Sequence, residues 1–229
     1  MRQQYEPSAD RIIALYQQLE DDILSAVIRR ILKMGYVSEA SKHQLEVLQA
    51  AGLLYDDIVQ LIADRTDACT AQVRALFEDA GVQTVEIDNS LHEAVGALPI
   101  DIRQDSSTRQ VLEAGYKKTL GTMRNLVSTT ATQTQTAFIQ TCDRIYMQVS
   151  SGAFSYQEAI MNALRALADT GATVSYPTGH TDRMDVAVRL CVLTGVSQTA
   201  AAVSLQQAED AGCYLMEITA HSGADRKST

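Results

Sequence analysis

The chain has 229 residues, enough for one large domain or two small ones. Its formal net charge of −9 disfavours a nucleic-acid-binding protein, because neutralising phosphates requires clustered Lys and Arg, so we expect no specific nucleic-acid partner. Trp is absent and only three prolines occur, which favours a mainly α fold whose core depends on aliphatic side chains.

The first element that we expect is a long amphipathic helix over residues 8–34. Apolar residues recur along it at spacings of three and four, among them Ile12, Leu15, Leu19 and Ile23, and Gly35 follows its end. At 1.5 Å per residue such a helix is about 40 Å long, and it suits lying along a neighbour.

A module of shorter helices is predicted next, over residues 38–52, 55–64 and 70–81. Gly52 and Gly81 are interpreted as stops, and a further helical stretch covers residues 82–95. Pro99 biases Leu98 away from helical geometry, so we place a boundary there and predict an N-terminal helical region over residues 1–97.

The central region, residues 98–175, is predicted to hold a second long helix over 106–149, with breaks considered at Gly115 or Gly121. Met123 and Leu126 mark its first apolar face, and Phe138 and Ile145 mark its second. Between these faces, residues 128–136 are rich in Thr and Gln and carry no charge. We interpret them as a bundle or oligomer contact, with a solvent-facing stretch or a kink as the alternative.

The rest of the central region has a local signature. Ser155 and Glu158 form a capping box that opens a helix ending at Gly171, and an extended segment over residues 172–176 follows. The C-terminal region, residues 176–229, is expected to be α+β.

In the C-terminal region, Pro177 and Gly179 set a turn and Thr181 is interpreted as a helix N-cap. The helix is predicted to stop at Gly195, and a final helix runs from Ser197 to Gly212. Alternating residues over 214–219 indicate a strand that pairs with residues 173–176, giving a small β-element near the C-terminus.

No catalytic, cofactor-binding or metal site is predicted. His180 and His221 lie in turn-like sequence near Asp182, Asp185 and Ser222, but the spacing fits no ligand or nucleophile pattern, so we favour turn and capping roles. His43 and His92 are expected on helix surfaces. The four cysteines are too far apart for a metal or redox motif, and we expect reduced, buried thiols: Cys69, Cys142, Cys191 and Cys213.

No membrane partner is expected either. No signal peptide is apparent, and we expect charged residues to interrupt the apolar stretches within a few residues. The chemistry that remains is binding through apolar helix stripes laid into partner grooves. The candidate contact faces are the two sets Ile12, Leu15, Leu19 and Ile23, and Met123, Leu126, Phe138 and Ile145.

Segments spread over nearly the whole chain resemble the phage minor capsid protein 2 family. These are tailed-phage head proteins related to head-morphogenesis proteins that act with the portal. No single segment is a chemical signature, but their order and combination are specific. The segments are residues 15–24, 29–35, 75–81, 124–131, 144–154, 176–199 and 209–224.

The resemblance implies a structural minor capsid protein that acts in head assembly by binding at or near the portal vertex. The implied partners are the portal protein, the major capsid protein or both, with self-association also open. The implied locations are the capsid interior near the portal and, during assembly, the host cytoplasm. The family pattern continues beyond His221-Ser-Gly-Ala224, so the chain looks truncated relative to it.

Two alternatives stay open at this point. One is an assembly chaperone or scaffold that is absent from mature particles. The other is the truncated remnant of a protein that carried a toxin-like enzyme domain at its C-terminus, because some relatives carry such domains.

Overall fold

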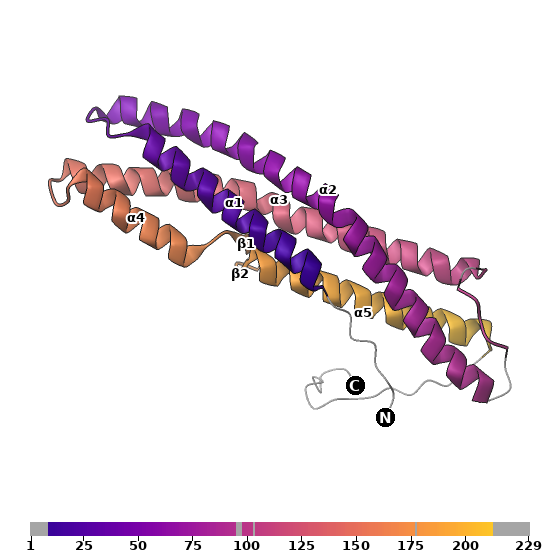
Figure 1. Ribbon diagram of the computed structural model, residues 1–229. Helices are drawn as coiled ribbons and strands as arrows, with labels where there is room; N and C mark the ends of the chain where they lie inside the picture. The colour runs from indigo at the N-terminus through magenta and orange to yellow at the C-terminus, as the bar shows by residue number, and fades with distance from the viewer. Residues whose placement is uncertain (1–8, 95–97, 103, 177, 213–229) are drawn as a thin grey trace.

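The computed structural model describes residues 9–94, 98–102, 104–176 and 178–212, and it confirms a mainly α fold with a small β-element. Figure 1 shows the helices lying side by side in an elongated bundle. The elements in these parts of the chain are α1 (Asp10–Met34), α2 (Ala40–Ala94), α3 (Ser106–Ser150), α4 (Tyr156–Thr170), β1 (Thr173–Ser175), β2 (Thr181–Arg183) and α5 (Met184–Asp210).

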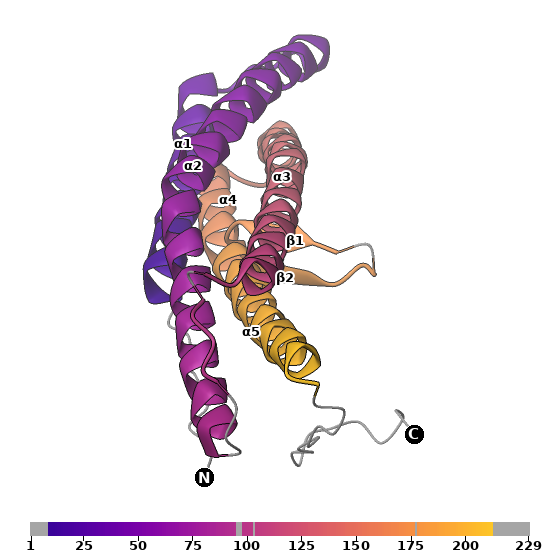
Figure 2. The ribbon, with the colours of Figure 1, turned by 90° about the vertical axis from the view of Figure 1, so that its right-hand side faces the viewer.

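The two longest helices, α2 and α3, run the length of the bundle, and shorter elements cover them. Helix α1 packs on α2. Helices α4 and α5 follow each other along α3, with the β1–β2 hairpin between them (Figure 1). Figure 2 shows this hairpin projecting from the side of the bundle. One cluster of buried apolar residues contains members from all five helices and β1, so a single core crosses all three predicted regions.

The buried residues recur at a spacing of eleven along the long helices. In α2 this series is Val47, Ile58, Cys69 and Ala80. An 11-residue repeat corresponds to about 3.67 residues per turn, close to the 3.6 of a straight helix. The buried stripe therefore stays on one side, and long helices can pack together without strong supercoiling. The same spacing relates Ile12 to Ile23, Tyr116 to Val127 and Phe138, and Val192 to Val203.

The predicted module of short helices is wrong, because residues 40–94 form one helix of 55 residues. Gly52 and Gly81 both lie inside it. A Cβ at Gly81 would overlap the side chain of Leu112 on α3, so this glycine serves helix packing and does not end the helix. The hydroxyls of Thr66 and Thr70 donate to carbonyls four residues earlier, at 2.7 and 2.9 Å, so these threonines bond within the continuous helix.

The predicted stop at Gly195 and the break considered at Gly115 are also wrong. Helices α3 and α5 run through these residues, because each glycine admits a threonine of the other helix. A Cβ at Gly115 would overlap the hydroxyl of Thr199, and one at Gly195 would overlap that of Thr119. Gly121, considered as another break, also lies within α3.

The β-element differs from the expected pairing. Thr173–Ser175 pairs with Thr181–Arg183 in an antiparallel hairpin, with Val174 opposite Asp182. Thr181 is thus a strand residue and no N-cap, and α5 begins at Met184, whose N–H donates to the Ala172 carbonyl at 3.3 Å. The strand predicted over residues 214–219 lies outside the described residues.

Locally encoded features follow the prediction closely. Helix α1 ends at Gly35, which has φ +69°. Ser155 and Glu158 form the capping box at the start of α4. Helix α3 is continuous from Ser106 to Ser150, although its cap is Asp105, whose carboxylate accepts the N–H groups of Ser107 and Thr108. The division into three domains stays a prediction.

Candidate partner-contact surface

Most side chains of the two predicted contact faces point into the bundle. Their exposed fractions are 6% or less for Ile12, Leu19, Ile23, Met123, Phe138 and Ile145, while Leu15 and Leu126 are partly buried and pack against the core. In this conformation the eight residues hold the helices together. A role in contacting a partner stays a prediction, and it requires the helices to separate.

The Thr- and Gln-rich segment over residues 128–136 makes bundle contacts on one side. The Thr130 hydroxyl is buried and donates to the Thr173 carbonyl at 3.4 Å, and Gln135 donates to the Ala51 carbonyl of α2 at 3.2 Å. Ser128 and Thr129 are exposed. The segment therefore ties α3 to α2 and to the hairpin.

Large apolar side chains are exposed at the end of the bundle where the α1–α2 and α3–α4 turns lie (Figure 1, left). Leu48 is 60% exposed and Met147 is 61% exposed. Extended exposed apolar surface on a soluble protein indicates an interaction site. We call this set the apolar end: Leu32, Tyr36, Leu45, Leu48, Met147 and Phe154.

Sequence reasoning missed the apolar end because the short helix predicted over residues 38–52 did not show whether Leu45 and Leu48 face inward or outward. In the continuous α2, the buried stripe contains His43, Val47 and Ala51 instead. Leu45 and Leu48 therefore form apolar surface outside that stripe. The signal in the sequence is that residues 38–52 contain more apolar residues than one buried stripe of a helix can hold.

Aromatic rings fix the geometry of the apolar end. Tyr146 stacks on His43 with ring centroids 4.4 Å apart, and Tyr36 lies 6.2 Å from Tyr146 and 6.0 Å from Tyr156. The Tyr146 hydroxyl donates to the Ser38 carbonyl at 3.3 Å, which joins α3 to the α1–α2 turn. These contacts tie both turns together.

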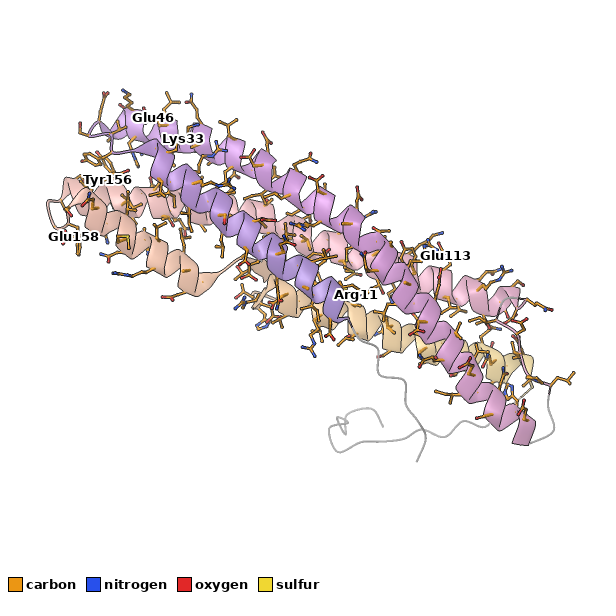
Figure 3. The ribbon with its side chains drawn as sticks, in the orientation of Figure 1. Arg11, Lys33, Glu46, Glu113, Tyr156 and Glu158 are labelled. Atoms are coloured by element: carbon orange, nitrogen blue, oxygen red, sulfur yellow. The ribbon has the colours of Figure 1, made fainter. Side chains whose placement is uncertain are left out.

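His43 differs from its prediction as a surface residue. It is only 7% exposed, and its Nε2 lies 3.6 Å from the Asp143 carboxylate. Charged groups of both signs surround the rest of this end, and Figure 3 shows Lys33, Glu46 and Glu158 on it, together with Tyr156. Apolar side chains within a polar rim are the usual composition of a protein interface.

A second polar junction, also missed, is the buried carboxylate of Glu20 on α1. Glu20 is 4% exposed, accepts the Ala172 N–H at 3.3 Å and pairs with Arg183 at 3.3 Å. A Cβ at Gly171, which has φ +68°, would lie 2.6 Å from Glu20 Oε1. Glu20 thereby fixes the hairpin onto α1. In the sequence it stands in the acidic run Glu20-Asp-Asp22 and looks like a solvated residue.

No group of three or more His, Cys, Asp or Glu side chains able to hold a metal occurs among the described residues. His180 pairs with Asp182 at 3.0 Å and stacks on Tyr176, and Asp185 lies 3.6 Å from Arg183. The predicted candidates His221 and Ser222 lie outside the described residues.

The cysteines of the described helices are free thiols, as expected. Cys69 and Cys142 are buried and Cys191 is partly buried. Burial raises the pKa of Cys69 and of Cys191 to about 11 and that of Cys142 to about 12, the last with a contribution from Asp143. Thiols with such pKa values stay protonated at neutral pH and are poor nucleophiles. Cys213 lies outside the described residues.

Helix α5 contradicts the expectation that charges interrupt every apolar stretch. It is long and apolar enough to cross a membrane by length and composition, and no charged residue lies between Arg189 and Glu209. Core helices of soluble proteins meet the same criterion. Here the stripe through Val192, Val196 and Val203 is buried, and α5 packs on α3, α2 and α1.

The comparison with protein families decides the identity. The model of the family described as phage minor capsid protein 2 matches residues 2–228, nearly the whole chain. The chain belongs to the phage minor capsid protein 2 family. The expectation of a structural minor capsid protein of a bacteriophage is thereby confirmed. Comparisons with curated proteins and with solved structures found no match.

Proposed function

We propose that this minor capsid protein acts in head assembly by binding at or near the portal vertex, to the portal protein, the major capsid protein or both. The observation that carries the proposal is the family match over residues 2–228. The corresponding locations are the interior of the capsid near the portal and, during assembly, the host cytoplasm.

The apolar end supplies a surface for such a contact. Its exposed leucine, methionine and aromatic side chains stand on a framework fixed by the packed rings of Tyr36, Tyr146 and Tyr156. A preorganised apolar surface binds with little loss of side-chain freedom. We therefore propose binding through this end. The two faces predicted from the sequence are a further possibility that requires the bundle to open.

We propose a structural role without catalysis. In support, burial raises the pKa of the thiols of Cys69 and Cys142, which makes them poor nucleophiles. Self-association stays a further prediction, and it bears on the copy number in the particle.

Quantitative mass spectrometry of purified filled particles and of unfilled heads tests the proposal. We expect the protein in filled particles at a low ratio to the major capsid protein. Presence in unfilled heads together with absence from filled particles would make it a chaperone or scaffold. Absence from both would contradict a role in the head and favour the alternative of an enzyme-carrier remnant.

A further inference from the structure

A groove of about 580 Å³ lies between α3 and α5. Small side chains line its floor, where the two helices cross at Gly115 and Gly195, and Ala114, Ala187 and Ala202 widen it. Leu190 borders it and is 59% exposed. Lys118 adds a positive charge to the lining. The groove is thus apolar, open and flanked by a cation.

Helix α5 ends in a turn at Gly212. Gly212 has φ +66°, and its N–H donates to the Glu209 carbonyl at 3.0 Å. A glycine with positive φ at a helix C-terminus reverses the chain direction. Gly35 and Gly171, with φ +69° and +68°, follow α1 and α4 in the same way, and after each of them the chain packs back onto the bundle as α2 and β1.

The segment that follows Gly212 has the composition and the reach to fill the groove. It reads Cys213-Tyr-Leu-Met-Glu-Ile-Thr219, which is mostly apolar and carries a single charge, that of Glu217. Six extended residues span about 20 Å at roughly 3.4 Å each. This equals about thirteen residues of helix at 1.5 Å, which brings Ile218 level with Gln198 and Met216 level with Ala202.

We propose that residues 213–219 dock into the α3–α5 groove of their own chain, running antiparallel to α5. Because the side chains of an extended segment alternate, Met216 and Ile218 then face the small-residue floor. Leu215 and Glu217 face outward, with Glu217 on the side of Lys118. This arrangement replaces the strand pairing expected from the sequence. Tyr176, beside the hairpin, borders the far end of the groove near Cys191, about 30 Å from Gly212 along α5 at 1.5 Å per residue.

Disulfide trapping tests the proposed register. The protein first receives Cys191→Ala and Cys213→Ser, which remove two native thiols. Cysteines are then introduced by Gln198→Cys and Ile218→Cys, and the protein is oxidised under mild conditions and analysed on a non-reducing gel. Gln198 lines the groove, whereas its neighbour Ser197 is exposed and lies outside the lining. We expect an intramolecular disulfide with Gln198→Cys and its loss with Ser197→Cys. Equal yields at the two positions would overturn the proposal. A disulfide-linked dimer would also overturn it, by placing a second copy in the groove.

A fluorescence measurement provides an independent readout, because the chain contains no tryptophan. The Met216→Trp variant should emit at a shorter wavelength than the same protein in denaturant. Adding Ala202→Glu, which puts a charge into the groove near Glu217, should abolish this shift. The matched change Ala201→Glu, on an exposed residue outside the lining, should preserve it. An emission that Ala202→Glu leaves unchanged would contradict docking.

Discussion

Helices α3 and α5 pack closely at two glycines and two threonines. Gly115 faces Thr199, and Thr119 faces Gly195, so each helix supplies one small and one hydroxyl-bearing residue. The Thr199 hydroxyl also donates to the Gly195 carbonyl at 2.8 Å, which keeps this side chain satisfied within α5. Small residues let the two backbones approach, and this explains why helix-breaking residues stand in mid-helix here.

The first prediction compares two glycines of α3. Gly115→Ala should destabilise the protein by about 1–3 kcal/mol, because the new methyl group overlaps Thr199 in a packed contact. Gly121→Ala should stabilise it by up to about 1 kcal/mol, because nothing lies within 4 Å and alanine favours the helix. Urea unfolding measures both. Equal effects at the two positions would contradict the close contact.

The second prediction concerns pH and the cap of α3. Hydrogen bonds from Thr108 and Ser107 lower the pKa of Asp105 below its usual range. A carboxyl whose pKa is lower in the folded state stabilises the fold above its unfolded pKa of about 4, and that contribution is lost as the pH falls through the folded value.

The variant Asp105→Asn keeps a capping side chain but removes this titration. As the pH falls from 7 to 3, the unchanged protein should therefore lose more stability than the Asp105→Asn variant. Asp105→Ala should lose about 1 kcal/mol at pH 7. A difference between the unchanged protein and Asp105→Asn that does not vary with pH would show that the carboxylate does not act as described.

At the scale of elements, the feature that distinguishes this fold is the uninterrupted α2. The sequence breaks its apolar pattern with Gly52 and with the polar residues around Asp67, so local rules predict several short helices. The buried stripe nevertheless continues through Ile58, Thr66 and Cys69. Burial against α1 and α3 along the whole length outweighs the weak local propensity.

A proline substitution distinguishes one helix from several. Asp67 is exposed and lies between two of the predicted short helices. In a continuous helix, Asp67→Pro removes a backbone hydrogen bond and should destabilise the protein by about 3 kcal/mol or more, whereas Asp67→Ala should be nearly neutral. Thermal unfolding followed by circular dichroism measures both. A tolerated proline would indicate that the helix is interrupted near this position.

What the sequence alone predicts depends on how local each signal is. The capping box at Ser155, the end of α1 at Gly35 and the two ends of α3 follow from neighbouring residues, and they are predicted correctly. The helices through Gly115 and Gly195 are not, because the reason for each glycine lies on the other helix. The burial of Glu20 and His43 is not predicted for the same reason, since their partners are distant in sequence.

The contact surface was the hardest feature to predict. Periodicity marks Leu19, Ile23, Met123 and Phe138 as one face of each helix, but it does not distinguish the core of the chain from an interface between chains. The structure places these residues in the core. It leaves Leu45, Leu48 and Met147 exposed at one end of the bundle, and this surface appears only once the inner stripe of the long helices is known.

At the scale of the whole molecule, the bundle is a rod whose length is set by α2. Its 55 residues span about 80 Å at 1.5 Å per residue. A compact domain of this chain length would have a radius of gyration of about 17 Å. Small-angle X-ray scattering should therefore give a clearly larger radius and a maximum dimension of at least about 80 Å. A radius near 17 Å would contradict the extended bundle.

A rod with an apolar end suits a protein that bridges other components of a phage head. The most direct test of this account replaces two leucines of that end, Leu45→Lys with Leu48→Lys, and measures incorporation into particles by mass spectrometry. The matched control is Leu205→Lys, an exposed leucine (49%) near the other end, on α5. Circular dichroism verifies that both variants fold.

We expect the protein with both lysines at the apolar end to fold normally and to be lost from the particles, while the Leu205→Lys protein enters them at the ordinary ratio to the major capsid protein. Normal incorporation of the folded apolar-end variant would contradict binding through this surface.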